Sequence, residues 1–142
     1  MYKNILLALD LGDDKSWERS LPTAVEYAKT FGAALRIMSV VPDFGMSIVG
    51  SFFPKGYEDK MLEQAREALH AFVKENVPDG VTVQHVIGHG TVYDEVLRVA
   101  GEVSADLIVL GASRPRAGQF LMGPNALRVM RDAECSVLVV RN

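Results

Sequence analysis

Runs of consecutive apolar residues, separated by segments with a helical period, dominate the chain. Four runs are continuously apolar over four or more positions, which is the pattern of a strand covered on both faces. A fifth run alternates more and is rich in β-branched residues, so we expect it at an edge of a sheet. The predicted strands are Asn4–Leu9, Ala34–Val41, Val81–Ile87, Asp106–Leu110 and Ser136–Val140.

Four segments between these runs carry apolar residues three and four positions apart, as amphipathic helices do. The first ends at Gly32, a favoured helix stop, and the second ends before a Pro-Asp-Gly turn. The predicted helices are Ser16–Phe31, Lys60–Val77, Val92–Val103 and Asn125–Ala133. The long segment Pro42–Tyr57 is rich in Phe and Met, and is either a surface flap or a lid or partner-contact loop.

Strands and helices alternate along the whole chain, which implies parallel strand pairs joined by right-handed crossovers. We therefore expect an α/β fold, a three-layer open sandwich. Its five-stranded parallel sheet, in the order 3-2-1-4-5, would carry helices on both faces. The 142 residues, 49% hydrophobic and 23% charged, suit one globular domain over residues 1–142.

Charge and cysteine content narrow the function classes. The formal net charge of −3 argues against a nucleic-acid partner, which would require a basic face. The single cysteine, Cys135, cannot form a disulfide within the chain and fits a reducing compartment. The first ten residues lack a cleavage signature and no apolar run reaches about 18 residues. We therefore expect no signal peptide and a cytoplasmic protein without membrane insertion.

The carboxyl ends of the strands are the expected place for a ligand, because doubly wound sheets bind ligands where the strand order reverses. Three segments should meet there. They are Ala8–Asp10, Ser39–Val41 and the loop that starts at Gly111. Asp10 could accept a hydrogen bond from a ribose hydroxyl, or it could cap the loop or helix that follows.

The loop after the fourth predicted strand carries the most informative residues. Gly111 directly follows a buried strand and allows close approach to a ligand. Gly123 is the predicted N-cap and Pro124 the first helical residue, where free N–H groups can hold an anion. Arg114 and Arg116 add positive charges that suit phosphate. The loop is therefore either an anion site or a structural connection with solvated arginines.

Other candidate chemistry is weaker. His85 and His89 lie four residues apart across the expected end of a strand, so they form no helical metal pair, and we expect no metal site. Ser113 lacks a Gly-x-Ser-x-Gly context and an obvious histidine partner. Cys135 is expected to be a small buried hydrophobe rather than a reactive thiol. We therefore expect no catalytic residue among them.

These segments together resemble the universal stress protein family, and the resemblance covers the whole chain. The first strand ends in Asp10, as it does in the family. His89–Val96 is similar to the family's Gly-x-Pro-x-x-x-Ile turn into the third helix. Ala105–Gly111 resembles its fourth strand, and Ala133–Arg141 resembles its C-terminal strand.

The phosphate loop departs from the family pattern. ATP-binding members carry Gly-x2-Gly-x9-Gly-[Ser/Thr], to which this chain is similar at Gly111 and Gly123. Arg114 stands at the middle glycine, the loop is one residue shorter, and Pro124 replaces the final Ser/Thr. Pro124 has neither a hydroxyl nor a backbone N–H for a phosphate oxygen. Each lost donor could cost on the order of 1–3 kcal/mol.

The same loop also resembles a distinct branch of the family, with an Arg-Pro loop and a Gly-[Ser/Pro]-Asn-Ala end, which includes nucleotide binders. We hypothesise that Arg114, Arg116 and Asn125 replace the missing phosphate donors. The resemblance implies a pocket for adenine and ribose beside a phosphate loop. The residues expected to contact nucleotide are Ala8, Leu9, Asp10, Val40, Leu110, Gly111, Ser113, Arg114, Arg116, Gly123, Pro124, Asn125 and Ala126.

The resemblance implies a nucleotide-binding regulatory or stress-response protein with little or no catalysis. Its cofactor would be ATP or another adenine nucleotide, with or without magnesium. The alternatives are a dimeric interaction module that binds no nucleotide, as the altered loop would permit, and a slow ATPase. Family members usually pair their last strands, which implies a homodimer through Ser136–Arg141 and leaves a further protein partner unidentified.

Overall fold

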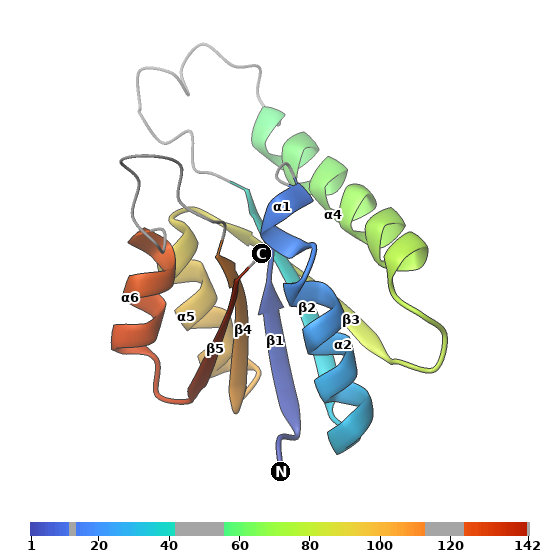
Figure 1. The fold of residues 1–142 in the computed structure, drawn as a ribbon. Coiled ribbons are helices and arrows are strands. Elements are labelled where there is room, and N and C mark those ends of the chain that lie inside the picture. Colours follow the sequence, from blue (N-terminus) through green and yellow to red (C-terminus); the bar gives the residue numbers. More distant parts are fainter. Residues whose placement is uncertain (12–13, 42–55, 113–123, 142) are drawn as a thin grey trace.

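The computed structural model of the protein describes residues 1–11, 14–41, 56–112 and 124–141 (Figure 1). Strands and helices alternate within these residues, as the apolar pattern predicts. The strands are β1 (Asn4–Ala8), β2 (Ala34–Val41), β3 (Val83–His89), β4 (Leu107–Ala112) and β5 (Ser136–Arg141). The helices are α1 (Asp14–Trp17), α2 (Ser20–Phe31), α4 (Tyr57–Asn76), α5 (Val92–Glu102) and α6 (Pro124–Asp132).

The five strands form one parallel sheet in the order β3-β2-β1-β4-β5, which confirms the predicted fold class. At its centre, Ile5 of β1 is aligned with Leu35 of β2 on one side and with Leu107 of β4 on the other. β3 lies at one edge, as its alternating pattern predicts, and β5 lies at the other. The strand order therefore reverses between β1 and β4.

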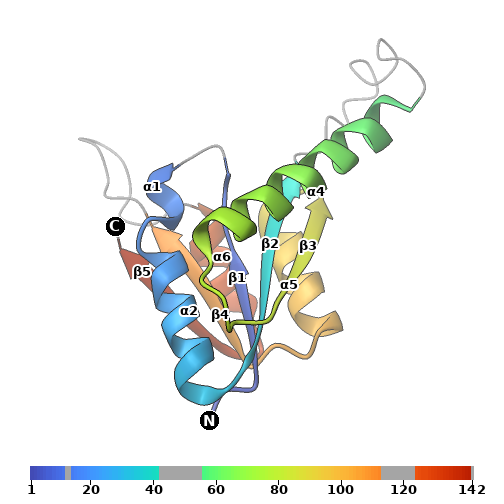
Figure 2. The same ribbon diagram turned by 90° about the vertical axis from the view of Figure 1, so that its right-hand side faces the viewer.

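Helices cover both faces of the sheet, with α2 and α4 on one face and α5 and α6 on the other (Figures 1 and 2). Side chains of β1 alternate between the two layers. Ile5 and Leu7 pack against α2 and α4, whereas Leu6 packs against α5 and α6, and all three are completely buried. Burial on both faces explains the continuous apolar run of this strand.

Ser16–Phe31 does not form the single helix that the periodicity predicts, because a turn separates α1 from α2. The physical reason is Pro22, whose ring would clash with the carbonyl of Glu18 in a continuous helix. In the observed structure Pro22 falls in the first turn of α2, where proline is tolerated. The Thr23 hydroxyl and N–H both donate to the carbonyl oxygen of Arg19, at 2.8 and 3.1 Å.

Two strands begin later than predicted. Asp106 lies just before β4, where its carboxylate accepts hydrogen bonds from the N–H groups of Lys3 (2.8 Å) and Asn4 (3.0 Å). This carboxylate ties the start of β1 to the start of β4. β3 ends two residues later than predicted and contains both His85 and His89. Four steps along a strand separate these residues by about 13 Å, too far to share a metal ion.

Most of the predicted loop Pro42–Tyr57 lies outside the described residues, since 42–55 are not among them. Tyr57, at its end, is the first residue of α4. Among the described helices, none combines the length and the apolar character that a bilayer-spanning segment requires.

Candidate functional site

A pocket of about 290 Å³ lies at the carboxyl ends of β1, β2 and β4, beside the first turns of α5 and α6. It therefore lies where the strand order reverses, the place at which open α/β sheets bind ligands. The residues that line it are Ala8, Leu9, Asp10, Val40, Val92, Val96, Leu110, Gly111, Asn125, Ala126 and Val129.

The structure brings most of the predicted nucleotide contacts together around this pocket. The predicted residues that line it are Ala8, Leu9, Asp10, Val40, Leu110, Gly111, Asn125 and Ala126. Pro124 is the first residue of α6, the helical position predicted for it. Ser113, Arg114, Arg116 and Gly123 lie outside the described residues, so their roles stay predictions.

Three pocket residues were missed by the reasoning from sequence, namely Val92, Val96 and Val129. They had been assigned to the apolar faces of α5 and α6, and Val96 and Val129 are indeed almost completely buried. The missed signal is their position in the first two turns of the helices that follow β3 and β4. In a βα unit, the first turn of the helix lies beside the carboxyl end of the strand.

The walls of the pocket are mainly apolar, and its polar side chains lie at the rim. Asp10 and Asn125 are both exposed. An ionised carboxylate only accepts hydrogen bonds, whereas an amide can also donate them. Asn125 lies in the first turn of α6, at the positive end of the helix dipole. The arrangement suits a flat apolar group inside, a hydroxyl near Asp10 and an anion near Asn125.

The turn between β3 and α5 fixes one wall of the pocket. Gly90 has a φ of 128°, which only glycine adopts readily, and its N–H donates to the carbonyl oxygen of Val41 at 3.0 Å. Glu95 Oε1 accepts the N–H of His89 at 2.8 Å, and Oε2 accepts Arg98 Nε at 2.7 Å. The hydrogen bond from Arg98 lowers the pKa of Glu95, and these contacts hold the first turn of α5 in place.

Titratable side chains elsewhere do not assemble into a metal site. Within the residues that the structure describes, no group of three or more His, Cys, Asp or Glu side chains could hold a metal ion. The rings of His70 and His85 pack edge to face, with centroids 5.1 Å apart. Burial, and secondarily His70, lowers the pKa of His85. This pair lies between α4 and β3, away from the residues that line the pocket.

Comparison with known proteins gives one consistent answer. The profile of the universal stress protein family matches residues 1–141. Universal stress protein G of Escherichia coli is 29% identical over 143 residues, covering 99% of this chain and all of that protein. A universal stress protein of Methanocaldococcus jannaschii is 32% identical over 145 residues, covering 99% of this chain and 83% of that protein.

A solved structure has the same fold. It is a universal stress protein in complex with cAMP, 24% identical to this chain, with a TM-score of 0.62. The match covers 99% of this chain and 97% of that one. Because the family profile spans nearly every residue and the relatives align from end to end, the chain belongs to the universal stress protein family.

Proposed function

We propose that the chain binds an adenine nucleotide in the pocket at the carboxyl ends of β1, β2 and β4, and acts as a regulatory protein with little or no catalysis. One observation carries the proposal. Three segments far apart in sequence, represented by Asp10, Val40 and Gly111, meet around one apolar pocket. A relative with the same fold, solved in complex with cAMP, supports an adenine-containing ligand.

The size and chemistry of the pocket agree with such a ligand. Its volume of about 290 Å³ is near the lower end of ligand pockets, roughly 300–1,000 Å³. We therefore place the adenine ring among the apolar side chains, and the ribose hydroxyls at Asp10. The phosphates extend toward Asn125, with Arg114 and Arg116 as further donors. ATP, with or without magnesium, is the first nucleotide to test.

A substitution that fills the pocket tests this placement. Val92 lines the pocket but is 37% exposed, so tryptophan can replace it without entering the core. We expect calorimetry to show micromolar ATP binding to the wild type and a loss of about a hundredfold in Val92→Trp, equivalent to about 2.7 kcal/mol. Leu127→Trp is the matched control, because Leu127 is an exposed apolar residue of α6 outside the pocket.

Two further variants separate the parts of the ligand. Asp10→Asn should weaken adenosine and ATP alike, whereas Arg114→Ala/Arg116→Ala should weaken ATP at least about tenfold and leave adenosine unchanged. Unchanged ATP binding in the double arginine variant would contradict the hypothesis that these arginines hold the phosphates, and would still support nucleotide binding. Absence of ATP binding up to millimolar concentration would overturn the proposal and leave a dimeric interaction module.

We also propose that the protein acts in the cytoplasm as a homodimer through Ser136–Arg141. β5 is an edge strand, and its four middle residues, Val137–Val140, are only partly buried. Val139 belongs to neither core cluster, so Val139→Lys should spare the core and disfavour pairing between edge strands. Sedimentation should show a dimer for the wild type and for Val92→Lys, and a monomer for Val139→Lys. A monomeric wild type would contradict the dimer.

A further inference from the structure

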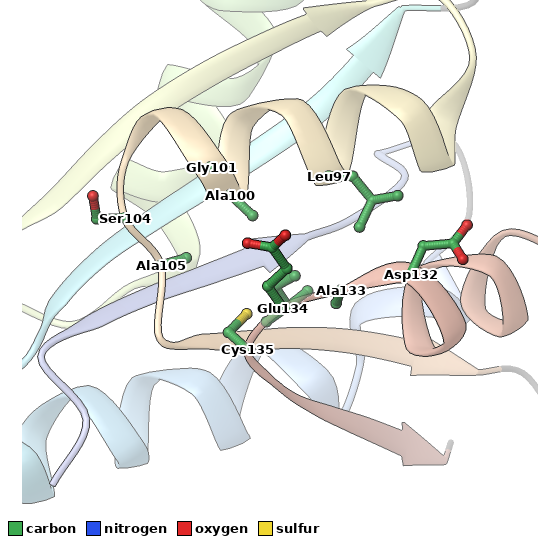
Figure 3. Close-up of a pocket in the computed structure, with 10 residues that line it drawn as sticks. Leu97, Ala100, Gly101, Ser104, Ala105, Asp132, Ala133, Glu134 and Cys135 are labelled. Atoms are coloured by element: carbon green, nitrogen blue, oxygen red, sulfur yellow. The ribbon is translucent and has the colours of Figure 1, made fainter.

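A second cleft, of about 550 Å³, lies at the opposite end of the sheet, between the carboxyl-terminal parts of α5 and α6 (Figure 3). We call it the lower cleft. It shares no lining residue with the nucleotide pocket. The residues that line it are Leu97, Ala100, Gly101, Ser104, Ala105, Ile108, Asp132, Ala133, Glu134 and Cys135.

The lining combines apolar side chains with hydrogen-bond acceptors. The partly exposed side chains of Leu97, Ala105 and Ala133 give it an apolar surface. The polar side chains among the described lining residues are one hydroxyl and two carboxylates, and none of them carries an N–H donor. The Ser104 hydroxyl can donate only one hydrogen bond to an anion, and the two carboxylates would repel it. A ligand with N–H donors and an apolar stem would instead find acceptors and an apolar surface.

Of the three arginines on the two flanking helices, two are held by carboxylates, and Arg128 donates to the Tyr93 hydroxyl at 3.1 Å. Arg131 donates to both carboxylate oxygens of Asp132, at 2.8 and 3.0 Å. Arg98 is held by Glu95 and by Glu102, each with a contact of 2.7 Å. The carboxyl ends of α5 and α6, which carry partial negative charge, also lie at this cleft. Arg131 offsets the charge of Asp132. The electrostatic potential that the helix ends leave at the cleft favours a cation.

Glu134 supplies an unneutralised charge. Within the described part of the chain, its carboxylate has no ion pair and no hydrogen bond, although no fewer than three arginines lie on α5 and α6. Figure 3 shows this carboxyl group pointing across the cleft toward α5. A ligand cation in the cleft would therefore meet a carboxylate that does not first have to leave an internal partner.

Gly101 keeps the cleft open. It is the penultimate residue of α5 and its φ is not positive, so the backbone does not require a glycine. A Cβ atom built on Gly101 would meet no heavy atom within 4 Å, so packing does not require a glycine. The absent side chain therefore leaves free space beside the apolar surface.

We propose that the lower cleft binds an arginine side chain from a basic peptide segment of a protein partner. The stem of an arginine can lie on Leu97 and Ala105 while its guanidinium group meets Glu134 and the Ser104 hydroxyl. The planar guanidinium, with five donors, suits this acceptor-rich lining better than a compact ammonium group. The inference does not depend on nucleotide binding, since the two sites share no residue.

Cys135 provides a built-in reporter for the cleft. It is the single cysteine of the chain and it lines the cleft, with its sulfur directed toward α5 in Figure 3. Burial raises the pKa of this thiol, so it should react slowly. Alkylation by iodoacetamide at about pH 8.5, near the ordinary thiol pKa, would follow the accessibility of the cleft.

The probe is a five-residue peptide with one central arginine flanked by alanines, and its control carries citrulline, which is isosteric and uncharged. We expect the arginine peptide, at up to about 10 mM, to slow alkylation of Cys135 about tenfold, and the citrulline peptide to have no effect. The arginine peptide should also shift the amide resonances of residues 97–105 in the nitrogen-15 spectrum of the protein. Equal protection by citrulline, or none by arginine, would overturn the proposal.

Variants then locate the binding site. Glu134→Gln should raise the peptide concentration for half-protection about tenfold, as expected for loss of one charge-assisted contact. Glu63→Gln, at an exposed position of α4, is the matched control and should change nothing. Gly101→Leu should fill the cleft and slow alkylation without peptide. An equal loss in Glu63→Gln would mean unspecific attraction to an acidic protein and would contradict the proposal.

Discussion

The two ends of the parallel sheet each carry a cavity, and the same two helices border both, with their amino ends at one cavity and their carboxyl ends at the other. At the carboxyl ends of the strands, the pocket meets the amino-terminal turns of α5 and α6, with Asn125 at its rim. At the other end, the lower cleft meets the carboxyl-terminal turns of the same helices, with Glu134 at its edge. We propose a nucleotide, with its phosphates near Asn125, for the first cavity and an arginine side chain for the second.

This contrast follows from the fold. Parallel strands joined by helices on one face place all helix amino ends at one edge of the sheet and all carboxyl ends at the other. The local side chains then reinforce this polarity, since Glu134 lies at the negative edge. Shared helices also mean that both cavities rest on one apolar layer, which contains Leu6, Val99 and Ile108.

The largest expected effect comes from breaking that shared layer. Leu6→Ala removes a completely buried side chain under α5 and α6, and should lower the free energy of unfolding by about 2–5 kcal/mol. Leu7→Ala, equally buried on the other face, should cost about as much. Urea unfolding measures both costs. Amide shifts should change in α5 and α6 only for Leu6→Ala, and similar shifts in both variants would contradict separate layers.

A smaller loss of stability is expected from a substitution at Glu95, which holds the turn beside the pocket. Glu95→Gln removes the charge that binds Arg98 and the N–H of His89, so we expect a loss of about 1–2 kcal/mol at pH 7. The folded pKa of Glu95 is lowered, so its contribution exists above the unfolded value of about 4.3 and disappears as the pH falls through the folded value. Urea unfolding at several pH values measures it.

The control for this pH dependence is Glu67→Gln, at an exposed position of α4. Its stability should follow that of the wild type between pH 3 and pH 7, within about 0.5 kcal/mol. The alkylation rate of Cys135 should be unchanged in Glu95→Gln, because Glu95 does not line the lower cleft. If Glu95→Gln still had a lower free energy of unfolding than the wild type below pH 3, then packing, and not charge, would hold the turn between β3 and α5.

The smallest expected effect on stability comes from a substitution at Gly101, which lines the lower cleft. Gly101→Ala fits without a clash and should raise the free energy of unfolding by about 0.4–1 kcal/mol, because alanine has less conformational entropy than glycine in the unfolded chain. The added methyl group should also weaken the arginine peptide and leave ATP binding unchanged. Thermal melting and both titrations measure these effects, and a destabilised variant would contradict the open space at Gly101.

The prediction from sequence succeeded where the physical signal is local. Four continuous apolar runs and one alternating run identified the five strands of the described sheet, and Gly32, with a φ of 62°, ends α2 as its glycine predicts. The predicted helix Ser16–Phe31 was wrong because periodicity was allowed to outweigh Pro22, a local signal that was present. The start of β4 was wrong by one residue because Asp106 hydrogen-bonds to a segment more than a hundred residues away.

The sequence by itself determined the elements, the parallel sheet and the family, because these depend on periodic burial and on short motifs read along the chain. It also indicated Asp10, Gly111 and Asn125 as neighbours, since the carboxyl ends of parallel strands meet at one edge. Only the tertiary structure decided which valines complete the pocket, and that α5 and α6 enclose a second cleft beside Glu134. Both depend on how closely two helices approach over the sheet, a distance set by side-chain packing that no local pattern encodes.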